Sequence, residues 1–200
     1  MTAAYSSPAT ARNQGPILEV LRTRLPAEAR VLEIASGAGE HAVHIAAALP
    51  EISWRPTDRD EAALASIAAW RAAAGLPNIL EPLALDASSP QAWPTDPIDA
   101  IVCINMIHIA PWDATLGLMR GAAAHLPQGG RLFLYGPYRE DGAFEAPSNA
   151  AFDLDLKRRN PAWGIRDRES VAAAAAEQGL LMEERIPMPA NNLILVFRRA

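Results

Sequence analysis

The sequence lacks most of the features that mark secreted and membrane-spanning proteins. Of its 200 residues only one is a cysteine, Cys103, which excludes an intramolecular disulfide and a cysteine zinc site. Cys103 lies in an apolar run, which predicts a packed core thiol rather than a nucleophile. No stretch of 18 apolar residues is present, and residues 1–15 lack a signal-peptide core. We therefore expect a cytoplasmic protein with no membrane partner.

Excess positive charge is also lacking. The net charge is −5 and the pI is about 5.4, so the chain has no overall attraction to nucleic acid or anionic membrane. A local basic run, Lys157-Arg158-Arg159, is followed by Arg166 and Arg168, and we interpret it as a solvated helix face. A small-molecule substrate is the expected partner, bound by a monomer or a homodimer.

Strands alternate with helices through most of the chain, which argues for one α/β domain spanning residues 1–200. Parallel strands are expected at 30–35, 52–58, 79–86, 98–105 and 131–136. Helices are expected at 8–25, 40–49, 60–74, 113–125, 148–159 and 168–178. The last two strands, 181–188 and 192–199, have little room between them and should form an antiparallel hairpin. The prediction is a seven-stranded, mostly parallel sheet with helices on both faces.

A glycine loop follows the first of these strands, in the stretch VLEIASGAGEH at 31–41. Such a loop lets the backbone approach a ligand closely, and the helix after it offers unpaired N–H groups. This geometry serves either a dinucleotide pyrophosphate or S-adenosylmethionine (SAM). From Gly37 the chain also satisfies the loose dinucleotide pattern G-x-G-x-x-G/A, and a plain structural turn is a third interpretation.

Acidic residues near the loop help to choose between these ligands. Glu33 lies inside the first strand, where a carboxylate is costly to bury without a polar partner. The ammonium group of SAM or a network of backbone N–H groups could supply that partner. Asp58 ends the second strand, 21 residues after Gly37, where it can accept hydrogen bonds from both ribose hydroxyls. The alternative is that such an acid only caps the next helix.

The segment from Glu33 to Gly39 resembles the first motif of class I SAM-dependent methyltransferases, E-x-G-x-G-x-G. Ala35 replaces the first glycine, and we expect it to be strand-like because alanine disfavours positive φ. The resemblance also implies that Asp86, at the end of the third strand, accepts from the adenine amino group. The cofactor-binding residues that follow from the motif and the strand ends are Glu33, Ala35, Ser36, Gly37, Gly39, Asp58, Asp86, Ala87 and Asn105.

A narrower resemblance runs from about Ser7 to Arg199. It is carried by SPATARNQGPILEVL, EIASGAGEHAVHIAAALP, CINMIHIAPW, LYGPY, APSNAAFD, NPAWGIRD and MPANNL. These stretches resemble domain-of-unknown-function family 938, which includes methyltransferase-like protein 26. The resemblance implies a Rossmann-like class I methyltransferase fold and dependence on SAM, and it implies little about the substrate.

The acceptor side is expected beyond the carboxyl ends of the fourth and fifth strands. His108 is the candidate general base, and Tyr138, with Arg139, is the candidate for positioning the acceptor. The alternatives are a histidine bonded to its own loop and surface packing of the insertion. Helix 8–25 and the insertion 137–166, which holds four aromatic residues, are expected to cover the cleft.

These residues predict a SAM-dependent methyltransferase that acts on a small molecule. The stretch from Asn105 to His108 departs from the N/D-P-P-Y motif of nucleobase methyltransferases, which argues against DNA methylation. His41 and His44 lack a third ligand, so no metal is expected. A non-catalytic SAM-binding protein and a dinucleotide-dependent oxidoreductase are the rival interpretations. The acceptor molecule, the acceptor atom and the use of a base stay open.

Overall fold

The computed structural model describes residues 4–89 and 93–200. The helices are α1 (Pro8–Arg24), α2 (Glu40–Ala48), α3 (Glu61–Ala74), η2 (Met106–His108), α4 (Trp112–His125), α5 (Pro147–Arg159) and α6 (Arg168–Ala176). The strands are β1 (Arg30–Ile34), β2 (Ser53–Asp58), β3 (Leu83–Ala84), β4 (Ala100–Ile104), β5 (Arg131–Gly136), β6 (Tyr138–Glu140), β7 (Ala143–Phe144), β8 (Arg166–Asp167), β9 (Leu180–Met188) and β10 (Asn192–Arg199). In the described residues no helix is both long enough and apolar enough to cross a membrane.

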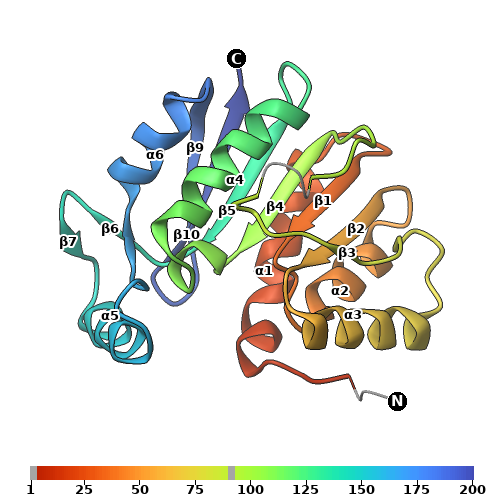
Figure 1. The fold of residues 1–200 in the computed structure, drawn as a ribbon, viewed down its shortest axis with the longest axis horizontal. Coiled ribbons are helices and arrows are strands. Elements are labelled where there is room, and N and C mark those ends of the chain that lie inside the picture. The colour runs from red at the N-terminus through yellow and green to blue at the C-terminus, as the bar shows by residue number, and fades with distance from the viewer. Residues whose placement is uncertain (1–3, 90–92) are drawn as a thin grey trace.

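Seven of the strands form one sheet in the order β3-β2-β1-β4-β5-β10-β9 (Figure 1). The pairs among β1 to β5 are parallel, and β10 runs antiparallel to both β5 and β9. This order confirms the predicted mostly parallel sheet and its C-terminal antiparallel hairpin. Because the carboxyl ends of the parallel strands lie at one edge of the sheet, the loops after them meet there.

Helices cover both faces of the sheet, as expected from the nearly continuous apolar strands. On one face Leu32 and its neighbours pack against α4 and α6, which contribute Leu118 and Val171. On the other face Val31 belongs to a second core with α1 and α2 (Figure 1). The apolar side of α1 is therefore part of this second core.

The third strand is shorter than the sequence indicates. Only Leu83 and Ala84 pair with β2, and a single bridge joins Ile79 to Trp54. Pro82 has no N–H to donate to the ladder, and it separates the two paired stretches. Asp86 consequently lies two residues beyond the strand rather than at its end.

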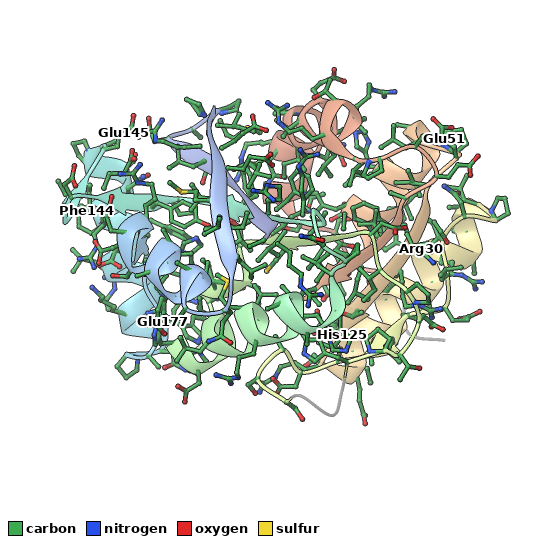
Figure 2. The ribbon with its side chains drawn as sticks, turned by 90° about the horizontal axis from the view of Figure 1, so that it is seen from above. Arg30, Glu51, His125, Phe144, Glu145 and Glu177 are labelled. Atoms are coloured by element: carbon green, nitrogen blue, oxygen red, sulfur yellow. The ribbon has the colours of Figure 1, made fainter. Side chains whose placement is uncertain are left out.

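The insertion after β5 is ordered and contains more structure than predicted. Helix α5 is accompanied by a three-stranded sheet, β7-β6-β8, whose strands are too short to show an apolar period. Asp153, 4% exposed, accepts from the Ile165 N–H at 2.8 Å, which fixes α5 to the chain after it, and it pairs with Lys157 within the helix. In Figure 2 the insertion residues Phe144 and Glu145 lie at the opposite end of the molecule from Glu51.

Asparagines bridge loops at this end of the molecule. The Asn149 side chain donates to the Asn191 carbonyl oxygen at 3.1 Å and so joins α5 to the turn between β9 and β10. The Asn192 amide donates to the Pro189 and Ala190 carbonyl oxygens within the same turn. These bonds link α5 to the β9–β10 turn and stabilise the turn itself.

Candidate functional site

A cavity of about 420 Å³ lies at the carboxyl ends of β1, β2 and β4, between the glycine loop and the start of α4. This volume is within the range of small-molecule sites in proteins. Five of the residues predicted to bind the cofactor line it, namely Ala35, Gly37, Asp58, Asp86 and Ala87. Strand β1 lies between β2 and β4, so the strand order reverses at this point of the sheet. The loops that follow β1 and β4 therefore lead to opposite faces of the sheet and leave a crevice between them.

The two loop glycines have different functions. Gly37 has φ of +58°, lines the cavity, and would place a Cβ atom where no other atom lies within 4 Å. Gly39 has φ of +96°, does not line the cavity, and would place a Cβ atom 2.9 Å from the Ile67 Cα. Gly39 therefore allows α3 to pack closely against the loop, whereas the open side of Gly37 belongs to the ligand space.

The expectation that Ala35 is strand-like is wrong. Strand β1 ends at Ile34, and Ala35 has φ of +56°, in the left-handed region. The chain must reverse direction at once to place Ser36 against β2, where its N–H donates to the Thr57 carbonyl oxygen at 2.7 Å. That requirement overrides the local preference of alanine and leaves strain in the loop.

We expect Ala35→Gly to raise the free energy of unfolding by about 0.5 kcal/mol. Left-handed backbone costs an alanine about 1–2 kcal/mol, and glycine loses about 0.4–1 kcal/mol through the greater freedom of the unfolded chain. Urea unfolding of the variant and of Ala46→Gly, a buried position inside α2, provides the comparison. Destabilisation of both variants to the same extent would contradict strain at Ala35.

Asp58 is placed to receive a ligand donor. It ends β2, is 8% exposed, and lines the cavity. Its Oδ2 accepts from the Gly37 N–H at 2.9 Å, and its Oδ1 accepts from the Asp60 N–H at 3.0 Å. A carboxylate has about four acceptor positions, so these two bonds leave capacity for hydroxyl donors from the cavity.

Asp86 both shapes a turn and lines the cavity. Its Oδ1 accepts from the Ser88 N–H at 2.9 Å and from the Ser88 hydroxyl at 2.6 Å. These bonds lower the pKa of Asp86, as does the more distant Arg59 guanidinium, while partial burial opposes them. Gly117 on α4 faces the Ala87 backbone so closely that no side chain fits, which holds α4 against this wall. Asp86 therefore stabilises the turn that follows it, and its predicted bond to adenine stays a prediction.

Glu33 has a hydrogen-bond partner inside the protein. It is 1% exposed, and its Oε2 accepts from the Trp54 indole N–H at 3.0 Å. Burial raises the pKa of Glu33 to about 7, although hydrogen bonds from Trp54 and Ser36 oppose the rise. Glu33 does not line the cavity, so the ammonium of a ligand is not needed to explain why this acid is buried.

Ser36 connects Glu33 to the neighbouring strand. Its hydroxyl bonds to the Glu33 carboxylate and accepts from the Thr57 N–H at 3.1 Å. Ser36 is buried and does not line the cavity. Glu33 and Ser36 therefore hold the glycine loop in position from its buried side. Direct contact with a cofactor stays a prediction for both.

The predicted acceptor-side residues lie together but apart from the cavity. His108 is 1% exposed, and its ring meets Tyr138 edge-on at 5.0 Å between centroids. Burial and the nearby Arg166 lower the pKa of His108 to about 3, so its ring is neutral at pH 7. Tyr138 is 2% exposed and Asn105 has φ of +63°, and none of the three residues lines the cavity. The catalytic assignments of His108 and Tyr138, and the cofactor contact of Asn105, stay predictions.

Other cavity residues were not identified from the sequence. The apolar wall comes from η2 and the start of α4, with Met106, Ile109, Pro111 and Ala114. The insertion contributes Asn160 and Trp163, and Arg159 lies over the Trp163 ring at 5.3 Å. The stretches CINMIHIAPW and NPAWGIRD contain all of these cavity residues except Ala114, but neither has a spacing that points to a ligand. Within residues 10–24 of α1, whose side chains the structure describes, none lines the cavity, so the function of this helix as a cover stays a prediction.

The family of the chain follows from a sequence comparison. The model of the family described as "Protein of unknown function (DUF938)" matches residues 4–199. The chain therefore belongs to this family.

Solved structures similar to the chain are SAM-dependent methyltransferases and O-methyltransferases. An O-methyltransferase family protein from Burkholderia thailandensis has a TM-score of 0.80 at 17% identity, over 96% of this chain and 57% of that one. An O-methyltransferase family 2 protein from Planctomyces limnophilus, in complex with apigenin, has a TM-score of 0.77 at 19% identity, over 96% and 60%. CalO1, a methyltransferase of calicheamicin biosynthesis with S-adenosylhomocysteine bound, has a TM-score of 0.76 at 15% identity, over 96% and 55%. The chain has the Rossmann-like methyltransferase fold and spans little more than half the length of these proteins.

The cavity fits the cofactor that this fold implies. The unobstructed side of Gly37 leaves room for an amino-acid moiety, and the spare acceptor positions of Asp58 suit vicinal hydroxyls. The wall of Met106 and Ala114 is apolar, which suits the faces of a flat purine.

Proposed function

We propose that the protein is a SAM-dependent methyltransferase that acts on a small-molecule acceptor. The observation that carries the proposal is the cavity in which Gly37, Asp58 and Asp86 converge from three successive loops at one edge of the sheet. When bound, SAM supplies a methyl group on a sulfonium. Asp58 would hold the ribose, the Gly37 backbone would admit the methionine part, and Met106 with Ala114 would enclose the adenine.

The chain's own residues would act by alignment and by excluding water. In-line methyl transfer needs the acceptor atom and the methyl group in contact, and a shaped site supplies that orientation. Trp163 and Asn160 lie at the insertion side of the cavity, where they would shield the reacting groups from solvent. An acceptor that carries a proton would need a base. His108 is the residue predicted for this function, although its burial outside the cavity and its lowered pKa make it a weak base.

The sheet order supports this function over a dinucleotide-dependent oxidoreductase. In the dinucleotide-binding fold the strand beyond β5 continues the parallel sheet. Here β10 takes that place and runs antiparallel to β5. Glu33 no longer bears on the choice, because Trp54 satisfies it whichever ligand binds. A SAM-binding protein without catalysis stays the main alternative.

We expect Asp58→Ala to weaken SAM binding by about 1.5 kcal/mol, which is about tenfold in affinity. The estimate lies at the lower end for bonds to a charged group because backbone N–H groups already share the carboxylate. Isothermal titration with SAM and with NAD measures the effect and separates the two cofactors.

Asp60→Ala is the matched control for this variant. Asp60 accepts from the Ala62 and Ala63 N–H groups as the N-cap of α3, and it does not line the cavity. Its loss should lower stability by about 1 kcal/mol and leave SAM affinity unchanged. Equal SAM affinity in the wild type and Asp58→Ala would remove the assignment of the ribose site. Labelled SAM with a metabolite extract, followed by mass spectrometry for methylated products, decides between an enzyme and a binding protein.

A further inference from the structure

A second cavity, of about 500 Å³, lies on the insertion side of α4 and is lined by charged and aromatic side chains. Arg139, Lys157 and Arg166 supply three cationic groups, and Asp167 supplies one carboxylate. Trp163 lines both this cavity and the first one, so the two cavities share a wall. A local excess of positive charge in a chain of net charge −5 calls for an explanation.

The carboxylates at this place neutralise only part of the positive charge. Arg139 donates through Nη2 to Asp167 Oδ2 at 2.6 Å, and Lys157 pairs with Asp153, also at 2.6 Å. Arg166 forms no salt bridge with any acid in residues 4–89 and 93–200. The result is one guanidinium in excess over the acids around it.

Backbone carbonyl oxygens hold Arg166 in place instead. Its Nε donates to the Ile107 carbonyl oxygen at 2.9 Å, and its Nη2 donates to those of Ala110 and Ala162 at 2.7 and 2.9 Å. The guanidinium also lies over the Trp112 ring, 5.6 Å from its centroid. These contacts fix the position of the cation without cancelling its charge.

The surroundings destabilise the Arg166 charge. Burial and repulsion from Arg139 lower the pKa of Arg166, and Asp153 only partly compensates. An anion in the cavity would stabilise the positive charge of Arg166. The N-terminus of α6, which carries the positive end of the helix dipole, lies at the cavity, because Ser170 in its first turn lines the cavity wall. The N-cap residue Asp167 makes no side-chain cap bond, so it leaves the first N–H groups of the helix uncapped.

We propose that this cation-lined cavity binds the oxyanion group of the methyl acceptor, which would therefore carry a carboxylate or a phosphate. The proposal rests on the proposed methyltransferase function. Arg139 and Lys157 would contact the oxyanion, Arg166 would supply the uncompensated charge, and the tryptophans would contact the apolar body of the molecule. The wall shared through Trp163 places such an acceptor beside the cofactor cavity.

Binding of simple anions tests the site without any turnover. The wild type is titrated with inorganic phosphate and, separately, with citrate at constant ionic strength, while tryptophan fluorescence reports on Trp112 and Trp163. We expect a saturable change that is weakened about three- to tenfold in Lys157→Met. Arg158→Met is the matched control, because Arg158 is the next residue of α5, is exposed, and does not line the cavity.

A second variant keeps the test decisive if Lys157→Met folds poorly after Asp153 loses its partner. Arg139→Gln retains a donor for Asp167 and should weaken anion binding to a similar extent. The proposal is overturned if the wild type shows no saturable response to either anion. It is also overturned if the cavity variants bind phosphate and citrate as tightly as Arg158→Met does.

The acceptor itself is tested with a metabolite extract separated on an anion-exchange column. Labelled methyl groups from SAM should appear in the retained, anionic fraction, and Lys157→Met should reduce their transfer more than Arg158→Met does. Products only in the unretained fraction would overturn the anionic acceptor and leave the methyltransferase function intact. An absence of product from every fraction would instead count against the methyltransferase function, and with it against an acceptor in this cavity. The anion titration would still decide whether the cavity binds oxyanions.

Discussion

Gly37→Val is expected to reduce SAM affinity more than about a hundredfold, which corresponds to a loss of at least about 2.7 kcal/mol. The loop places the open side of Gly37 in the cavity wall, and a Cβ atom there meets no protein atom within 4 Å. A branched side chain would therefore occupy ligand space rather than disturb the core. The φ of +58° adds strain, which costs about 1–3 kcal/mol of stability.

Gly75→Val is the control that separates the effect of backbone strain on stability from the effect of a blocked cavity on SAM affinity. Gly75 ends α3 with φ of +62°, and a Cβ atom at this position also meets nothing within 4 Å. It does not line the cavity, so the control should lose similar stability and keep its SAM affinity. Thermal unfolding measures the first quantity, and isothermal titration measures the second. Normal SAM binding by Gly37→Val would show that the loop is only a structural turn.

The sequence was sufficient to predict the parts of the site that depend on local patterns. The strand–loop–helix around Gly37 and the acid at the end of β2 follow from apolar runs, glycines and one aspartate. The mostly parallel sheet and the antiparallel pair β9–β10 follow from strand alternation and a short connection. Such features depend on neighbours in the sequence, and the structure confirms them.

The remaining features depend on contacts that no local pattern reveals. Trp54, 21 residues after Glu33, satisfies that acid from the adjacent strand. Ala35 adopts positive φ because Ser36 must reach β2, and this requirement appears only once β1 and β2 are paired. Trp163 reaches the cavity from the end of the insertion, where strands of two or three residues fix the chain.

Glu33→Gln is expected to abolish a large pH dependence of stability. The pKa of Glu33 is about 7 in the folded protein and about 4.5 ordinarily, so the folded state holds the proton more tightly. This contribution is fully present below pH 4.5 and is lost as the pH rises through 7. Its size is about 3 kcal/mol, from 1.36 kcal/mol for each pKa unit. Above pH 7 the wild type must bury a charge that glutamine does not carry.

The measurement is urea unfolding between pH 4.5 and pH 8. Near pH 4.5 the wild type and Glu33→Gln should have similar stability, because the Trp54 N–H finds an oxygen acceptor in both. At pH 8 the variant should be more stable by about 3 kcal/mol. Glu51→Gln, at an exposed position (Figure 2), is the control and should follow the wild type at every pH. A constant difference between wild type and Glu33→Gln would refute the raised pKa.

The same variant distinguishes two functions for this acid. If Glu33 bound the ammonium of SAM directly, neutral glutamine would lose a charge-assisted bond and about tenfold or more in affinity. The structure encloses Glu33 behind Ser36 and away from the cavity, so its effect on the ligand passes through the loop. Glutamine keeps the bond to Trp54 and can still reach the Ser36 hydroxyl. We therefore expect SAM affinity within about threefold of wild type, while stability at pH 8 rises. A large loss of affinity with normal stability would place the carboxylate in the ligand site after all.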